Sequence, residues 1–168
     1  MSESQARAAA APDPARGPED DALGLFTTLA RTGLFLDALQ RECLGAHGLS
    51  FNEFSVMRLL QRAPGRSLTP KALAREIVCT SGAMTKLLDR LQRARRVRRR
   101  PDPEDRRGVL VELTRKGDSD AEAAASTYRE GRERVLAKLR PRDVVSIGRN
   151  LESLLAGFES DHEATRSR

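Results

Sequence analysis

The sequence has no tryptophan, one tyrosine and five phenylalanines among its 168 residues. With so few aromatic side chains, the core must consist mainly of leucine, valine and alanine, which favours helices over a β-sandwich. Cysteine is scarce as well, because Cys43 and Cys79 are too few for a disulfide framework and have no metal-ligand spacing. We therefore expect a cytoplasmic protein without a metal or cofactor.

Long apolar runs are also missing. No uninterrupted run approaches the ~18 residues of a membrane span, and the N-terminus lacks the apolar segment of a signal peptide, so no membrane partner is expected. Residues 1–20 have no periodicity and are predicted to form a disordered tail. His47 and His162 are isolated, and there is no phosphate loop, metal spacing or nucleophile motif. The sequence thus argues against an enzyme.

What the chain does have is concentrated positive charge. The segment 86–107 carries ten basic and four acidic residues, a net charge of +6 in 22 residues, and the whole chain is also +6. The remaining residues therefore balance at zero. Concentrated basic charge favours a polyanionic partner, and we expect that partner to be double-stranded DNA.

Capping patterns predict a series of helices. A helical periodicity starts at Asp21 and runs to about residue 46. Ser50 and Glu53 have capping-box spacing, and Pro64-Gly65 ends the helix that they begin. A cap and first-turn proline at Thr69-Pro70 start a short helix to Val78, and Thr80 or Ser81 caps the next helix, whose buried stripe is Met84, Leu87, Leu88 and Leu91.

A basic hairpin follows these two short helices. Residues 108–113 alternate with a period of two, and residues 97–100 are their expected antiparallel partner. Thr114 then caps a long helix, and Pro141 starts the last one. The predicted fold class is mainly α with a small β-hairpin, arranged as a winged helix-turn-helix with further helices on either side.

This arrangement assigns roles in DNA binding. The free amides of Ser81 and Gly82 can bind a phosphate at the helix N-terminus, and Thr85, Lys86 and Arg90 lie on the outward face that would read bases. Arginines after this face are expected to bind phosphates, namely Arg93, Arg95, Arg96 and Arg98 to Arg100. Arg106 and Arg107 are expected at the wing tip, where one arginine can enter the minor groove and Asp105 would hold that arginine in position. The predicted DNA-binding residues are Thr69, Lys71, Thr80, Ser81, Gly82, Thr85, Lys86, Arg90, Arg93, Arg95, Arg99, Asp105, Arg106 and Arg107.

Several segments resemble the MarR family of bacterial transcriptional regulators, most specifically residues 99–117 of the wing, and also residues 49–54, 68–74, 81–85 and 88–91. The resemblance covers about residues 23–160. It implies a triangular homodimer on a pseudo-palindromic operator with half-sites ~10 bp apart. It also implies a single domain over 21–162, with dimerisation helices at 21–47 and 115–162, a DNA-binding part at 50–114, and a frayed end at 163–168.

The chain departs from the family pattern at two places. Arg95-Arg96 replace the usual Gly-Leu after the recognition helix, which predicts a strained or lengthened helix end that gains two phosphate contacts. The segments are most similar to the branch with an extra N-terminal helix, some of whose members sense urate. Those members use a Trp, an Asp and an Arg, whereas this chain has no Trp, and Ser55 and Leu87 occupy the other two places.

We therefore expect a sequence-specific regulator, most simply a repressor, modulated by an unidentified small ligand. Two alternatives remain open. Cys79 precedes the recognition helix, where its oxidation could move that helix, so the protein could be a redox sensor. The same charge would also suit a non-specific architectural DNA-binding protein.

Overall fold

The computed structural model describes residues 18–77, 79–103, 105 and 108–166. Most of the predicted tail, Val78, and the wing-tip residues Arg106 and Arg107 lie outside the described residues. The chain divides into two compact units, Met1–Leu39 and Gln40–Arg168, and the boundary falls inside the first helix.

Helix α1 spans Pro18–Gly45 and begins three residues before the predicted start at Asp21. Residues 19–45 are long enough to cross a membrane and contain an 18-residue window with a mean hydropathy of 1.3, which is a statement about length and composition only. The sequence-based expectation concerned continuous apolar runs, and α1 contains none of the length of a membrane span; the helix meets the composition criterion only on average. The polar residues of α1 are widely spaced, so the mean hydropathy of that window is high.

The second unit begins with the end of α1, where Cys43 and Leu44 are buried. Helix α2, Phe51–Arg62, has the predicted capping box: the Ser50 amide donates to Glu53 Oε2 at 2.9 Å, and the Glu53 amide donates to Ser50 Oγ at 3.3 Å. Helix α2 ends before Pro64-Gly65, as predicted, and a short 3-10 helix, η1, which was not predicted, occupies Pro64–Arg66.

Helices α3, Pro70–Glu76, and α4, Ser81–Arg93, form the predicted helix-turn-helix. Thr69 and Thr80 are their N-caps and accept hydrogen bonds from the amides of Ala72 and Ala83. Both caps are local interactions, which explains why the sequence located these helix starts correctly.

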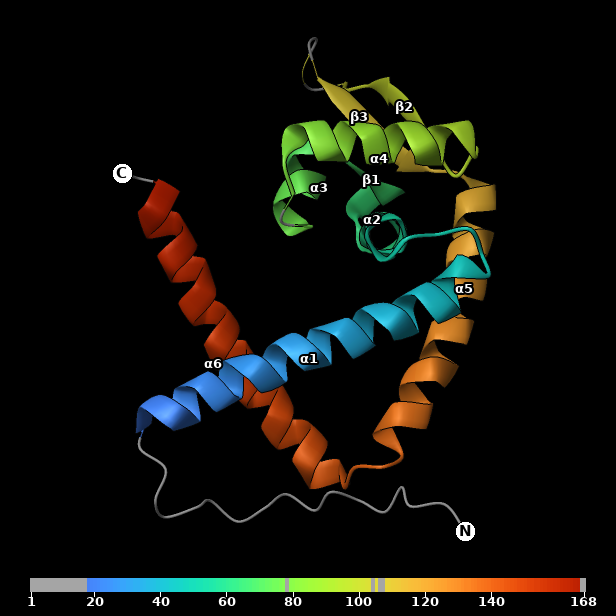
Figure 1. Cartoon of the computed structure of the whole chain (residues 1–168). Helices are drawn as coiled ribbons and strands as arrows, with labels where there is room; N and C mark the ends of the chain where they lie inside the picture. The colour runs from blue at the N-terminus through green and yellow to red at the C-terminus, as the bar shows by residue number, and fades with distance from the viewer. Residues whose placement is uncertain (1–17, 78, 104, 106–107, 167–168) are drawn as a thin grey trace. The chain divides into compact units, whose positions relative to one another are not determined.

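The sheet has three strands in the order β1-β3-β2, where the sequence predicted a two-stranded hairpin. Strands β2, Val97–Pro101, and β3, Val109–Leu113, pair antiparallel from Val97↔Leu113 to Pro101↔Val109 (Figure 1). The additional strand β1, Ser67–Leu68, pairs with the other edge of β3. Two residues are too short for a periodic pattern, so this strand was missed.

Two long helices complete the second unit. Helix α5, Arg115–Leu136, starts at the predicted cap, since Thr114 Oγ1 accepts from the Gly117 amide at 3.0 Å. Helix α6, Pro141–Arg166, starts at the predicted proline but continues past residue 162, where the sequence analysis placed a frayed end.

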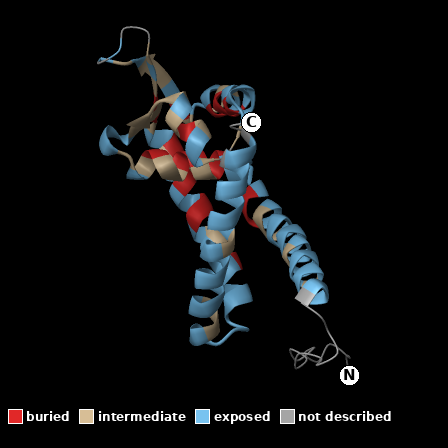
Figure 2. Ribbon diagram, turned by 90° about the vertical axis from the view of Figure 1, so that its left-hand side faces the viewer, coloured by how far each residue is buried: buried red, intermediate tan, exposed pale blue. Residues whose placement is uncertain are grey.

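The buried residues concentrate where α2, α4, the sheet and the first half of α5 meet (Figure 2). The predicted stripe of α4 is buried there in full, together with Val97, Val111 and Leu113 from the sheet. Helix α6 is exposed along almost its whole length. The core therefore packs against one face of α4, and among the described residues most of the opposite face is exposed to solvent.

Candidate nucleic-acid interface

The exposed face of α4 combines small and basic side chains. Ser81, Gly82, Thr85 and Lys86 are all exposed, as predicted, on the face opposite the buried stripe. A Cβ added to Gly82 would have no atom within 4 Å, so the backbone is open to close approach. The first amides of the helix have no partner inside it, so this end suits a phosphate oxygen.

Arg90 lies on the same face, but its side chain also forms an ion pair with Glu53 of α2. Its Nε donates to Glu53 Oε1 at 2.8 Å, and the side chain of Arg90 is 53% exposed against 10% for Glu53. Burial raises the pKa of Glu53, but hydrogen bonds from Arg90 and Ser50 outweigh it and hold this pKa below its usual value. The pair fixes the stem of Arg90 and leaves its two Nη atoms for DNA.

The other predicted contacts on the helices occupy suitable positions. Lys71 is exposed on α3, and Arg93 is exposed at the end of α4. Thr69 and Thr80 use their hydroxyl oxygens as cap acceptors, so each can still donate its hydroxyl proton to a phosphate.

The arginines of β2 are paired within the protein. Arg98 binds Glu112 through Nε and Nη2 at 3.2 and 2.7 Å, and Arg100 reaches the same carboxylate at 3.2 Å. Arg99 binds Asp89 at 2.7 Å. The cationic surface of the wing is therefore weaker than the count of arginines indicates.

The recognition helix ends in the strained conformation that the sequence predicted as one of two options. Arg95 has a φ of 58°, the left-handed region, directly after the cap residue Ala94. The Arg96 amide donates to the Leu91 carbonyl and the Arg95 amide to the Gln92 carbonyl, both at 2.9 Å, which is the Schellman pattern. Arg95 is exposed, so its side chain is accessible to a DNA phosphate in this geometry.

Arg96 does not fit its predicted role as a phosphate contact. Its guanidinium donates to Asp120 Oδ2 at 2.8 Å, to the His47 carbonyl at 2.6 Å and to the Gly48 carbonyl at 3.0 Å. The side chain is only 14% exposed. Local sequence patterns do not reveal these contacts, because all three acceptors are distant in the chain.

The base of the wing loop is a tight turn. The Asp102 amide donates to the Gly108 carbonyl at 3.0 Å, and the Gly108 amide donates to the Asp105 carbonyl at 2.8 Å. A Cβ at Gly108 would lie 2.9 Å from Asp102 Cβ, so this position requires glycine. Asp105 is exposed. Because Arg106 and Arg107 are outside the described residues, the contact of Asp105 with a wing-tip arginine stays a prediction.

Cys79 lies in the turn between α3 and α4. It is half-buried against the core, and its amide donates to the Ala74 carbonyl at 3.1 Å. Cys43 is buried in α1. Among the residues that the structure describes, no group of three His, Cys, Asp or Glu side chains could hold a metal ion.

A pocket of about 560 Å³ lies between α2, the end of α3 and α5. Its lining contains aromatic side chains and arginines, and Glu76 is the one carboxylate among the described residues that line it. The residues that characterise it are Phe51, Phe54, Tyr128, Arg58, Arg62, Arg129 and Arg132.

Comparison with known proteins agrees with this geometry. The chain matches the MarR family over residues 47–108. It is 34% identical over 139 residues to the HTH-type transcriptional repressor Rv2887 of Mycobacterium tuberculosis, and the match covers 82% of this chain and 97% of that protein. The chain belongs to the MarR family. This family consists of transcriptional regulators, which are not enzymes, as the sequence predicted.

Other MarR-family relatives match over different lengths. The HTH-type transcriptional regulator PecS of Dickeya dadantii is 33% identical over 92 residues, which are 54% of this chain and about half, 55%, of that regulator. A cysteine-to-serine mutant of MarR from Escherichia coli, solved in complex with operator DNA, superposes with a TM-score of 0.73 at 26% identity. The superposition covers 83% of this chain and 99% of the MarR chain.

Proposed function

We propose that this MarR-family protein is a sequence-specific DNA-binding repressor that binds a pseudo-palindromic operator as a homodimer. The observation that carries the proposal is α4, whose apolar stripe is fully buried while its opposite face presents small and basic residues beside an open N-terminus. This arrangement supports insertion of α4 into the major groove.

Each part of the surface has a separate role. Ser81 and Gly82 bind a phosphate, while Thr85, Lys86 and the Nη atoms of Arg90 contact base edges. Arg93, Arg95 and Lys71 attach the protein to the backbone without reading sequence. These assignments distinguish residues that set specificity from residues that set affinity.

The homodimer is supported by apolar side chains that the chain alone leaves in water. In the first unit, Leu34 and Phe35 of α1 are 71% and 72% exposed. In the second unit, Leu151, Leu155 and other apolar residues of α6 are exposed too. Apolar surface of this extent marks an interface, and a second copy would cover the same faces on both protomers. Such an interface also accounts for the apolar character of α1 in a protein of the cytoplasm.

A small ligand would bind in the pocket beside α2 and α5. Its guanidinium groups outnumber its carboxylates, and its walls include three aromatic rings, so it suits a small organic anion. Arg132 already stacks on Tyr128, with its guanidinium carbon 5.1 Å from the ring centroid. A ligand would change DNA binding only through a different affinity for the free and DNA-bound forms.

The proposal is tested by capturing fragments of the genome that encodes the protein. We expect at least one fragment to bind ~10³-fold more tightly than random duplex of equal length. A Thr85→Val/Lys86→Met variant should lose this preference and keep non-specific binding, while Lys138→Met, in the turn before α6, should behave as wild type. Equal binding of all fragments would instead favour the architectural protein.

Cysteine-based sensing can be decided in the same assay. A half-buried Cys79 beside α4 would have to change the packing of the turn when oxidised. If peroxide releases the preferred fragment from wild type but not from Cys79→Ser, the redox alternative is correct. We expect both proteins to respond alike.

A further inference from the structure

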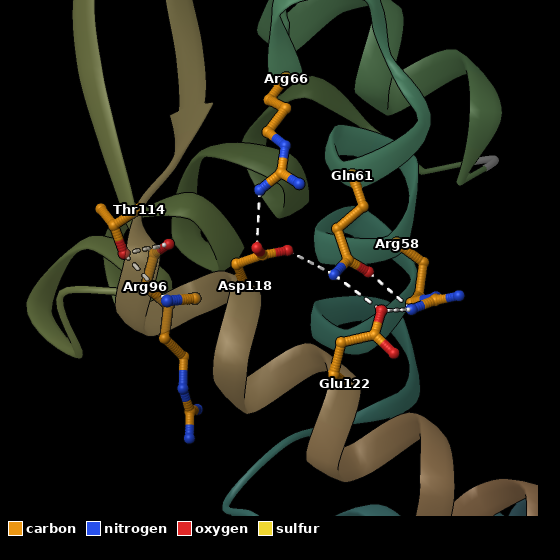
Figure 3. Close-up of polar contacts among 8 residues, drawn as sticks. Arg58, Gln61, Arg66, Arg96, Thr114, Asp118 and Glu122 are labelled. Atoms are coloured by element: carbon orange, nitrogen blue, oxygen red, sulfur yellow. Dashed lines mark hydrogen bonds and ion pairs between the residues drawn. The ribbon is translucent and has the colours of Figure 1, made fainter.

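Three carboxylates near the start of α5 each bind an arginine from a different part of the winged helix. Asp118 accepts from Arg66 Nη1 at 2.7 Å, and Glu122 accepts from Arg58 Nη1 at 2.6 Å (Figure 3). Asp120 accepts from Arg96 Nε at 2.8 Å. The start of α5 is thus attached to α2, to the segment before β1, and to the end of α4.

Of the three ion pairs, the one between Arg96 and Asp120 is the least exposed to solvent. The exposed fractions of the Arg96 and Asp120 side chains are 14% and 26%, against 56% for Arg66 and 61% for Glu122. Water and salt therefore screen it least. Burial raises the pKa of Asp120, but hydrogen bonds from Lys116 and Arg96 outweigh this and keep its pKa below the usual value, so the carboxylate is charged.

The same guanidinium reaches a third segment. Its two Nη atoms donate to the carbonyls of His47 and Gly48, in the loop between α1 and α2. One side chain therefore connects the end of α4, the start of α5 and the loop before α2. Charge-assisted hydrogen bonds of this kind are about twice as strong as neutral ones.

The backbone of Arg96 is fixed as well. Its carbonyl accepts from the Thr114 amide at 3.0 Å and from Thr114 Oγ1 at 2.9 Å (Figure 3). A Cβ at Gly117 would lie 2.0 Å from this oxygen, so the first turn of α5 lies directly against it. The residue that follows the strained end of α4 is therefore held by both its backbone and its side chain.

We infer that Arg96 is a positioning residue for DNA recognition: it holds the end of α4 against α5 and the α1–α2 loop, and so sets the angle at which α4 meets the major groove. This inference rests on the proposed function. A positioning role differs from a phosphate contact, because a phosphate contact would require the guanidinium to face solvent. It also differs from a bridge that only stabilises the fold, because such a bridge would not affect sequence preference.

DNA binding over a range of salt concentrations separates these roles. Arg96→Met should reduce the preference for the captured genomic fragment over random duplex by ~10-fold or more. It should leave the salt slope on random duplex unchanged. Arg93→Met, which removes a phosphate contact, should weaken both DNAs equally and reduce the salt slope by about 0.9. Asp120→Asn should also reduce the preference for the captured fragment. Lys116→Met, which removes the exposed partner of Asp120, should keep this preference.

Hydrogen exchange of the free protein tests the attachment without DNA. The Arg96 and Thr114 amides should exchange faster in Arg96→Met and Asp120→Asn than in wild type and Lys116→Met. If Arg96→Met does not fold, Asp120→Asn and Arg96→Lys carry the test, since a single ammonium cannot make all three contacts. Unchanged exchange, unchanged preference in a folded variant, or a reduced salt slope would each overturn the inference. A wild type without any preferred fragment would instead overturn the proposed function.

Discussion

Glu53 is the residue that joins the start of α2 to the recognition helix. The same buried carboxylate binds the Ser50 amide, the Ser50 hydroxyl and Arg90 Nε. Replacing it with glutamine removes the charge and one of the two acceptor oxygens, so at least one of these hydrogen bonds is lost and the others are weakened. Such a residue affects both stability and the geometry of DNA binding.

We predict that Glu53→Gln lowers the free energy of unfolding by about 1–3 kcal/mol at neutral pH. The folded pKa of Glu53 lies below its ordinary value of 4.5. The unfolded chain therefore binds the proton more readily, and the contribution of Glu53 is present above pH 4.5 and is lost as the pH falls through the folded pKa.

Urea unfolding at neutral pH and near ~pH 3 measures this effect. The difference between wild type and Glu53→Gln should shrink at the lower pH, whereas Glu76→Gln, an exposed control, should differ little from wild type at either. A difference that stays constant with pH would show that the charge of Glu53 is not responsible.

Gly117 is required by a backbone contact. Because an added Cβ would lie 2.0 Å from the Arg96 carbonyl oxygen, Gly117→Ala must displace the start of α5. We expect a loss of about 3 kcal/mol or more in the free energy of unfolding. Gly157→Ala, at an exposed position of α6 with no atom within 4 Å, should be neutral or stabilising by up to about 1 kcal/mol. Equal thermal stability of the two variants would refute the contact.

At the scale of elements, the end of α4 combines strain with charge. Arg95 occupies a left-handed position that glycine adopts without cost, so Arg95→Gly should stabilise the protein by about 1 kcal/mol. The same substitution should reduce the salt slope of DNA binding by about 0.9 if Arg95 contacts a phosphate. A higher melting temperature with an unchanged slope would show that Arg95 makes no such contact.

The wing is an element whose charge is partly neutralised from within. Hydrogen bonds from Arg98 hold the pKa of Glu112 below its usual value, so Glu112 offsets one of its two arginine partners at neutral pH. Glu112→Gln should therefore increase the affinity for random duplex several-fold and steepen its salt dependence, with little change in stability, because both arginines are substantially exposed. Glu130→Gln, on an exposed part of α5, is the matched control. An affinity that does not rise would place β2 away from DNA.

The elements also show what the sequence can predict. The caps at Ser50, Thr69, Thr80 and Thr114 depend on residues three positions away, so their helices could be predicted with the buried stripe of α4. Strand β1 and the contacts of Arg96 depend on partners far along the chain, which local patterns do not reveal. For the same reason, the sequence predicts phosphate contacts for the arginines of β2, whereas the fold pairs these arginines with carboxylates.

At the scale of the whole molecule, the proposal requires two copies. Leu151→Glu/Leu155→Glu places charge on the apolar face of α6, and we expect it to convert a dimer into a monomer in light scattering, with weaker binding to the preferred DNA fragment. Ser153→Glu, on the opposite face of the same helix, should remain dimeric. A monomeric wild type would contradict the homodimer.

Selection of bound sequences from a random DNA pool tests the central claim most directly. If α4 reads bases and two copies act together, the selected sequences should contain a pseudo-palindrome with half-sites ~10 bp apart. The Thr85→Val/Lys86→Met variant should not enrich this motif. A pool from which wild type enriches no motif would contradict sequence-specific regulation.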